Sequence, residues 1–126
     1  MHIMILYHQS PFEFDKFKFD LLGKDPDKSK NGRLGVWVWN KKPEKNTFGK
    51  YLYTIEYPII QPKEVEVERL FYWHNNYDFK KYDTTRCEYL EKGSNFLEII
   101  ESDFSSVMGI CLDIGSIKII ERSLHE

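Results

Sequence analysis

Runs of apolar residues, each closed by turn-forming residues, divide the first half of the chain into short β-type segments. Residues 2–7 form a β-favouring apolar run that ends near His8, before a turn-prone Ser-Pro pair. Residues 33–39 combine β-branched and aromatic side chains, and residues 51–57 alternate up to Pro58. These patterns predict three strands.

The aromatic segment after the first run has no regular period. Phe12, Phe14, Phe17 and Phe19 alternate with polar residues, but the alternation slips by one position between the second and third of them. In a continuous strand this slip would turn the later aromatic side chains to the opposite face. We therefore expect an irregular segment anchored by its aromatic residues, followed by an exposed polar loop over 23–32.

The second half of the chain mixes both patterns. Residues 59–68 alternate glutamate with valine, which is typical of an edge strand with a charged face. Residues 70–82 fit a short helix, although the period does not separate helix from strand there. A Gly-Ser-Asn break predicts two short helical pieces within 87–100, and two further strands are expected at 107–112 and 117–120. Together these elements predict one β-rich α+β domain over residues 1–126.

Composition agrees with one folded domain. Of the 126 residues, 41% are hydrophobic and 16% aromatic, enough to fill a core. No apolar run approaches the roughly 18 residues of a membrane span, and the first residues do not resemble a signal peptide. We therefore expect a cytoplasmic protein. Cys87 and Cys111 lack the spacing of a metal or redox motif, and the four histidines are scattered, so no metal site is predicted.

The charges divide unevenly along the chain. Residues 1–63 carry 11 Lys/Arg and 7 Asp/Glu, whereas residues 64–126 carry 7 and 13. The asymmetry can steer an anionic ligand toward the basic half. The pI near 6.1 lacks the basic excess of a nucleic-acid-binding domain, so nucleic acid is not the expected partner.

Three segments carry the chemical signal, since the phosphate-loop, dinucleotide-fold, zincin and hydrolase-elbow motifs are all missing from the sequence. The segments are YHQSP at 7–11 with the phenylalanines that follow, GRLGVWV at 32–38 with Pro43, and ICLD at 110–113 leading to SIKII at 116–120. In this order they resemble the ADP-ribosyltransferase family, in its bacterial and phage branch. The middle of the chain, roughly 58–102, adds nothing to the resemblance.

The resemblance implies an ADP-ribosyltransferase-like fold, a split two-sheet β core with short helices that binds NAD in the cleft between the sheets. Carried over, His8 would bond the ribose of the adenosine half, and Gln9 would stand where the backbone reaches the nicotinamide amide. Ser10 would support the histidine. Trp37 would stack on the nicotinamide ring, as an aromatic face suits a planar cation.

Two positions depart from the family pattern. Gln9 replaces a glycine that allows close approach of the backbone to the ligand. With Asp113 aligned to the family's aspartate, Met108 or Gly109 falls where the catalytic glutamate belongs. That glutamate stabilises the charge that develops as nicotinamide leaves. Glu101, a short distance upstream, is the candidate to replace it if its loop folds back.

These observations predict a protein that binds NAD or an ADP-ribose-like nucleotide. It would either transfer ADP-ribose to a macromolecular target, with a protein as the expected target, or be a catalytically degenerate member. Its small size fits a phage inhibitor of a host defence enzyme, an analogy based on fold and size alone. The alternative is a non-catalytic protein-interaction module. The two hypotheses differ in whether His8 and Trp37 line one open pocket.

Overall fold

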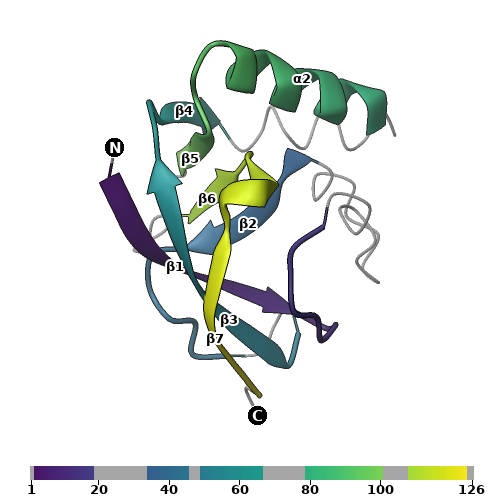
Figure 1. Cartoon of the computed structure of the whole chain (residues 1–126), viewed down its shortest axis with the longest axis vertical. Helices are drawn as coiled ribbons and strands as arrows, with labels where there is room; N and C mark the ends of the chain where they lie inside the picture. Colours follow the sequence, from purple (N-terminus) through teal and green to yellow (C-terminus); the bar gives the residue numbers. More distant parts are fainter. Residues whose placement is uncertain (1, 19–33, 46–48, 67–78, 101–107, 125–126) are drawn as a thin grey trace.

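The computed structural model describes residues 2–18, 34–45, 49–66, 79–100 and 108–124 (Figure 1). The strands are β1 (His2–Ser10), β2 (Val36–Trp39), β3 (Tyr51–Ile59), β4 (Lys63–Glu66), β5 (Phe96–Ile100), β6 (Met108–Cys111) and β7 (Lys118–Leu124). The helix α2 (Phe79–Glu91) and the 3-10 turn η3 (Ile114–Ser116) complete the elements in these ranges. The seven strands form one mixed sheet in the order β4-β5-β6-β2-β1-β3-β7, which confirms the α+β class.

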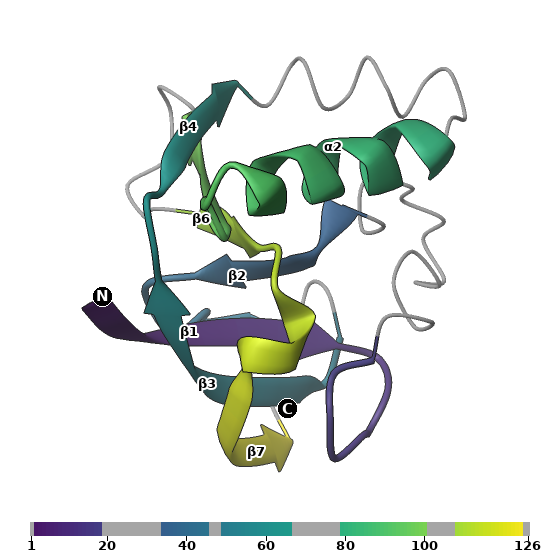
Figure 2. The same cartoon turned by 45° about the horizontal axis from the view of Figure 1, so that its top comes forward.

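The sheet consists of two halves that meet at a single residue pair. Within β4-β5-β6-β2 and within β1-β3-β7, neighbouring strands are paired over four or more positions. Between β1 and β2 the only registered pair is Tyr7 opposite Trp39. Figure 2 shows α2 lying over the four-stranded half, away from β7. The sheet is thus continuous but narrowest at its centre.

Two hydrophobic clusters pack against this sheet. We call the first the inner core: Leu6, Phe17, Val36, Val38, Tyr53, Ile55, Tyr57, Ile59, Phe96 and Cys111. We call the second the helix-side core: Leu34, Val65, Tyr82, Leu97, Ile99, Ile110 and Leu112. Because β5 and β6 contribute alternate residues to both clusters, both faces of these strands are buried.

The helix α2 packs through one stripe of its surface. Tyr82 is fully buried in the helix-side core, and Tyr89, two turns later, packs against the same cluster. The helix ends in a Schellman motif, in which Gly93 N donates to Leu90 O and Ser94 N donates to Tyr89 O, both at 3.0 Å. Gly93 has a φ of 88°, a conformation that favours glycine.

Most of the predicted elements are confirmed, and one is wrong. The strands expected in the first half and at 107–112 and 117–120 are present, segment 11–18 is irregular, and β4 is an edge strand with Glu64 and Glu66 exposed. The two helical pieces expected within 87–100 are instead the end of α2 followed by β5. The part of 70–82 before residue 79 lies outside the described residues.

Two strands are longer than their sequence signals. β1 continues past His8 to Ser10 because it pairs with β3 along its whole length, Ser10 lying opposite Tyr51. β3 continues through Pro58, which lies opposite Ile3 of β1. The pairing between β3 and β7 begins only at Glu56, so Pro58 lies where β3 has one neighbouring strand. A missing N–H at such a position does not remove a ladder hydrogen bond.

Asn95 joins the two halves of the sheet at one end. Its Oδ1 accepts a hydrogen bond from Ile60 N at 2.8 Å, and its Nδ2 donates to Pro58 O at 2.6 Å. Its carbonyl oxygen accepts from Leu112 N at 2.9 Å and from the Tyr57 hydroxyl at 2.5 Å. Through these hydrogen bonds, the buried Asn95 connects the end of β3 to the start of β5.

Replacing this amide is expected to weaken the fold. Asn95→Ala leaves Ile60 N and Pro58 O without their partners at a site that is 6% exposed, so the free energy of unfolding should fall by about 2 kcal/mol. Urea titration followed by tryptophan fluorescence measures the loss. Lys92→Ala, an exposed side chain in the adjacent turn, is the control and should change stability by less than about 0.5 kcal/mol. Equal stability of the two variants would contradict the bridging role.

Candidate functional site

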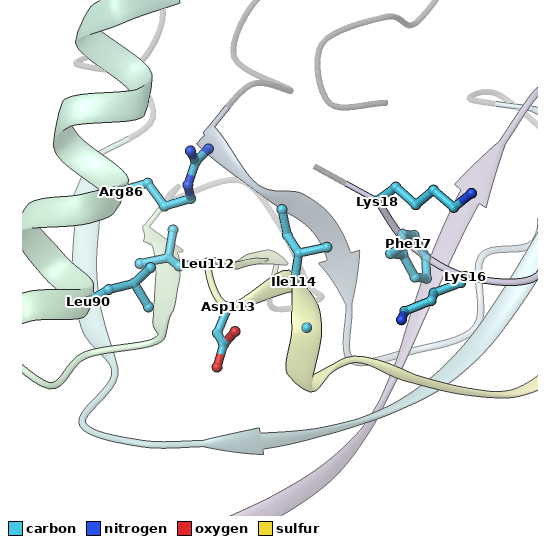
Figure 3. Close-up of a pocket in the computed structure, with 9 residues that line it drawn as sticks. Lys16, Phe17, Lys18, Arg86, Leu90, Leu112, Asp113 and Ile114 are labelled. Carbon is cyan, nitrogen blue, oxygen red and sulfur yellow. The ribbon is translucent and has the colours of Figure 1, made fainter. Parts of the chain in front are cut away.

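A pocket of about 490 Å³ opens between segment 11–18, the turn η3 and the helix α2 (Figure 3). Its lining residues are Lys16, Phe17, Lys18, Arg86, Leu90, Leu112, Asp113, Ile114 and Gly115. The volume is in the range of small-molecule sites, which run from about 300 to 1,000 Å³. The lining combines three cationic side chains, one carboxylate and four apolar side chains.

The wall formed by segment 11–18 is held in place although it has no regular secondary structure. The Tyr53 hydroxyl accepts from Phe14 N and donates to Phe12 O, each at 2.8 Å. From β7, Arg122 donates to Phe14 O and to Asp15 Oδ1, each at 2.9 Å. These bonds satisfy backbone groups that a strand would otherwise pair, and they fix the part of the wall next to the two pocket lysines.

Aromatic packing attaches the same wall to the inner core. Phe14 stacks on Tyr53 with ring centroids 4.3 Å apart, and Phe17 meets Phe14 edge to face at 4.8 Å. Phe17 also makes an edge contact with the His8 ring at 5.2 Å. Phe17 therefore lies between the pocket and His8.

The floor of the pocket is the connection from β6 to η3. Asp113 N donates to the buried Tyr57 hydroxyl at 3.0 Å, and Ser116 Oγ donates to Asp113 Oδ2 at 2.6 Å. Burial raises the pKa of Tyr57, so this hydroxyl keeps its proton and remains a neutral bridge. Both the backbone and the carboxylate of Asp113 are thus held by hydrogen bonds.

The opposite wall comes from α2. Arg86 is 5% exposed, and its guanidinium forms an ion pair with Asp83 one turn earlier, at 3.4 Å. Leu90, 36% exposed, lies one turn further along the same side of the helix. Lys16 and Lys18 on the facing wall are exposed. The pocket therefore has two exposed ammonium groups on one side and an ordered guanidinium on the other.

His8 lies beside this pocket and not among its lining residues. Its Nδ1 donates to the Trp37 carbonyl oxygen at 2.7 Å, which assigns the proton of the neutral ring to Nδ1. Burial among the aromatic rings lowers the pKa of His8 to about 4, and the hydrogen bond to Trp37 opposes this shift only in part. The ring is therefore neutral at physiological pH.

The structure brings His8 to the backbone of Trp37 and not to its indole. The neighbours Val36 and Val38 belong to the inner core, and alternation along β2 turns the Trp37 side chain to the helix-side core. His8 contacts Phe17 and therefore lies on the inner-core side. The two side chains therefore do not line one open pocket. The NAD hypothesis from the sequence had required that they do.

The other residues nominated from the sequence have local structural roles or lie outside the described part. Gln9 is buried, and its Nε2 donates to Lys45 O at 2.5 Å. Ser10 is also buried, and its Oγ accepts from Phe12 N at 3.0 Å, which stabilises the turn after β1. Glu101 lies outside the described residues, as does the polar loop 23–32.

Sequence reasoning missed most of the pocket. Lys16, Lys18, Arg86 and Leu90 belong to no motif, and the two walls lie far apart in the chain. Asp113 was named only as the residue that aligns with the aspartate of the family pattern. The available signal was weak: two lysines flanking Phe17 in a segment already identified as irregular and aromatic.

Within the described ranges, no group of three or more His, Cys, Asp or Glu residues is arranged to hold a metal ion. None of the described helices has the length and apolar character needed to cross a membrane. Comparisons of the chain with family models, with curated proteins and with solved structures gave no match. The function therefore has to be argued from the pocket itself.

Proposed function

We propose that this protein binds NAD or an ADP-ribose-like nucleotide in the pocket between segment 11–18, η3 and α2. One observation carries the proposal: three cations and four apolar side chains surround the same volume of about 490 Å³. A nucleotide diphosphate has the matching two-part character, with an anionic centre and a planar apolar base. The basic charge of the first half of the chain would favour the approach of such an anion.

The cations suit a phosphate group for different reasons. The Arg86 guanidinium is almost fully buried and paired with Asp83, so it is an ordered positive group of the α2 wall, and the exposed lysines are the cations that a phosphate reaches. Lys16 and Lys18 present mobile ammonium groups from the other wall.

The apolar side chains suit the base or the nicotinamide ring. Phe17 is fixed by its contacts with Phe14 and His8, so an aromatic surface is already in place before a ligand arrives. Leu90 and Ile114 add aliphatic surface on the other side of the pocket, in front of the buried Leu112. Such pre-formed apolar surfaces with a few polar groups are typical of small-molecule sites.

The proposal includes the finer fold suggested by the sequence, an ADP-ribosyltransferase-like split β core. The narrow join between the two half-sheets supports it. If the protein is an active transferase, nicotinamide would leave NAD, and a nucleophile on a macromolecular target, expected to be a protein, would take the ADP-ribose. Glu101 is the acid nominated to stabilise that step.

Isothermal titration with NAD and with ADP-ribose tests the binding. We expect saturable binding to the wild type and at least about tenfold weaker binding to Lys16→Glu/Lys18→Glu, because two like charges would then face the phosphates. The matched control is Lys41→Glu/Lys42→Glu, which reverses two exposed lysines that do not line the pocket. The control should bind as the wild type does. Equal weakening of both variants would mean that the pocket is not the binding site.

Two further outcomes separate the remaining possibilities. Nicotinamide release from bound NAD that is lost in Glu101→Gln would show that the protein cleaves the bond between nicotinamide and ribose, and ADP-ribose attached to a target protein would identify an active transferase. Absence of heat with either ligand would overturn nucleotide binding. The protein-interaction module would then be the better hypothesis, since Ile3, Ile5 and Ile120 are 62%, 42% and 44% exposed on β1 and β7.

A further inference from the structure

Asp113 stands out because it brings a carboxylate into a pocket whose other charged lining residues are cations. Its geometry is fixed from two sides, by the bond from Ser116 Oγ to Oδ2 and by the bond from its own N–H to Tyr57. Ser116 occupies one carboxylate oxygen, and Oδ1 remains as an acceptor among the described residues. The side chain is therefore an oriented hydrogen-bond acceptor on the pocket floor.

The surroundings of Asp113 indicate which part of a ligand it would meet. In Figure 3 Asp113 lies on the α2 side of η3, between Leu90 and Ile114. Lys16 and Lys18 lie on the other side of Ile114. Phosphates held by the lysines would leave the apolar region, and Asp113 within it, to the base.

A carboxylate in this position discriminates between bases. Beside an anionic ligand it lowers affinity unless the ligand supplies a hydrogen-bond donor, because the two negative charges repel each other and the bound ligand displaces water from the carboxylate. Adenine presents an exocyclic amine, which donates. Hypoxanthine presents a carbonyl oxygen at the same position, which would face the carboxylate and be repelled.

We propose that Asp113 selects the base of the bound nucleotide and favours adenine over hypoxanthine through a hydrogen bond from the exocyclic amine to Oδ1. This inference rests on the proposed nucleotide binding and deepens it. The role of Ser116 is to hold the carboxylate so that Oδ1 stays directed at the base. Asp113 is thus a specificity-determining residue of the pocket.

The test compares NAD with nicotinamide hypoxanthine dinucleotide, and ADP-ribose with its hypoxanthine counterpart, by isothermal titration. For the wild type we expect the adenine ligand of each pair to bind about 10- to 100-fold more tightly, the range of a hydrogen bond to a charged group. In Asp113→Asn the amide can accept or donate, so the two ligands of a pair should bind within about threefold of each other. Glu64→Gln, an exposed acid on β4, should keep the wild-type preference.

The possible results are distinguishable. Equal binding of adenine and hypoxanthine ligands to the wild type overturns the role of Asp113 and leaves nucleotide binding intact. A preference that persists in Asp113→Asn overturns it as well, since another group would then read the base. No binding of any of the four ligands overturns the proposed function, and the inference with it. Equal binding of the two bases to the wild type needs no variant, so this overturning result does not depend on how Asp113→Asn folds.

Discussion

Gly49→Ala should lower the free energy of unfolding by about 4 kcal/mol, the largest effect we expect from a single methyl group in this chain. Gly49 precedes β3 and has a φ of 141°, which side chains rarely tolerate. A Cβ atom there would overlap the backbone of Ser10 and Pro11 at the end of β1. Backbone atoms cannot rotate away as a side chain can, so strand and turn would have to separate.

Urea unfolding followed by tryptophan fluorescence measures this loss. Gly115→Ala is the matched control: the glycine is exposed, its φ lies outside the left-handed region, and its nearest neighbour would be Asp113 Oδ1 at an ordinary 3.7 Å. We expect the control to change stability by less than about 0.5 kcal/mol. If Gly49→Ala is as stable as the control, the start of β3 does not pack as closely against the end of β1 as the structure indicates.

The second large effect is a loss of stability in mild acid that originates at His8. The folded protein holds the pKa of His8 at about 4, against an ordinary value of 6.5 in the unfolded chain. Between these values the unfolded state binds a proton that the folded state does not, so stability falls as the pH falls from 6.5 toward 4. This loss of stability is about 3 kcal/mol at pH 4 and levels off below that pH.

His8→Asn isolates this contribution. The asparagine amide can still donate to the Trp37 carbonyl, but it does not titrate. Free energies of unfolding at pH 7.0, 5.5 and 4.5 should show the wild type losing its advantage over the variant as the pH falls. A constant difference across the three pH values would show that the folded protein accepts the proton on His8 without cost.

The elements with strong local signals were predictable from the sequence. β1, β2 and β3 lie on apolar or alternating runs next to Ser-Pro, a Pro-containing turn and Pro58, so their position needed no tertiary information, although β1 and β3 extend past these signals. β5 was not predictable in the same way. Phe96 and Leu97 face different cores, so both faces of the strand are apolar and its period resembles that of a buried helix.

The site was less predictable than the fold, for a geometric reason. His8 was correctly placed in the first strand, although β1 continues to Ser10 and exposes Ile3 and Ile5. The face toward which the Trp37 side chain points depends on register, which the sequence does not state. Arg86 reaches the pocket only because α2 packs over the four-stranded half, beyond any local motif. Tertiary packing, not spacing, brings the two walls together.

The position of β6 has a consequence for how the protein folds. β6 lies between β5 and β2, and β2 is a near neighbour of β1 in the chain but distant from β6. The four-stranded half therefore cannot assemble by adding hairpins one after another, because β5 and β6 are consecutive antiparallel strands but β2 lies far upstream of both. Closing such a long loop costs entropy before any contact compensates for it, and folding rates fall as contacts become less local. The rate-limiting step is expected to be the docking of the β5–β6 pair on β2, after the β1–β3 pair has formed.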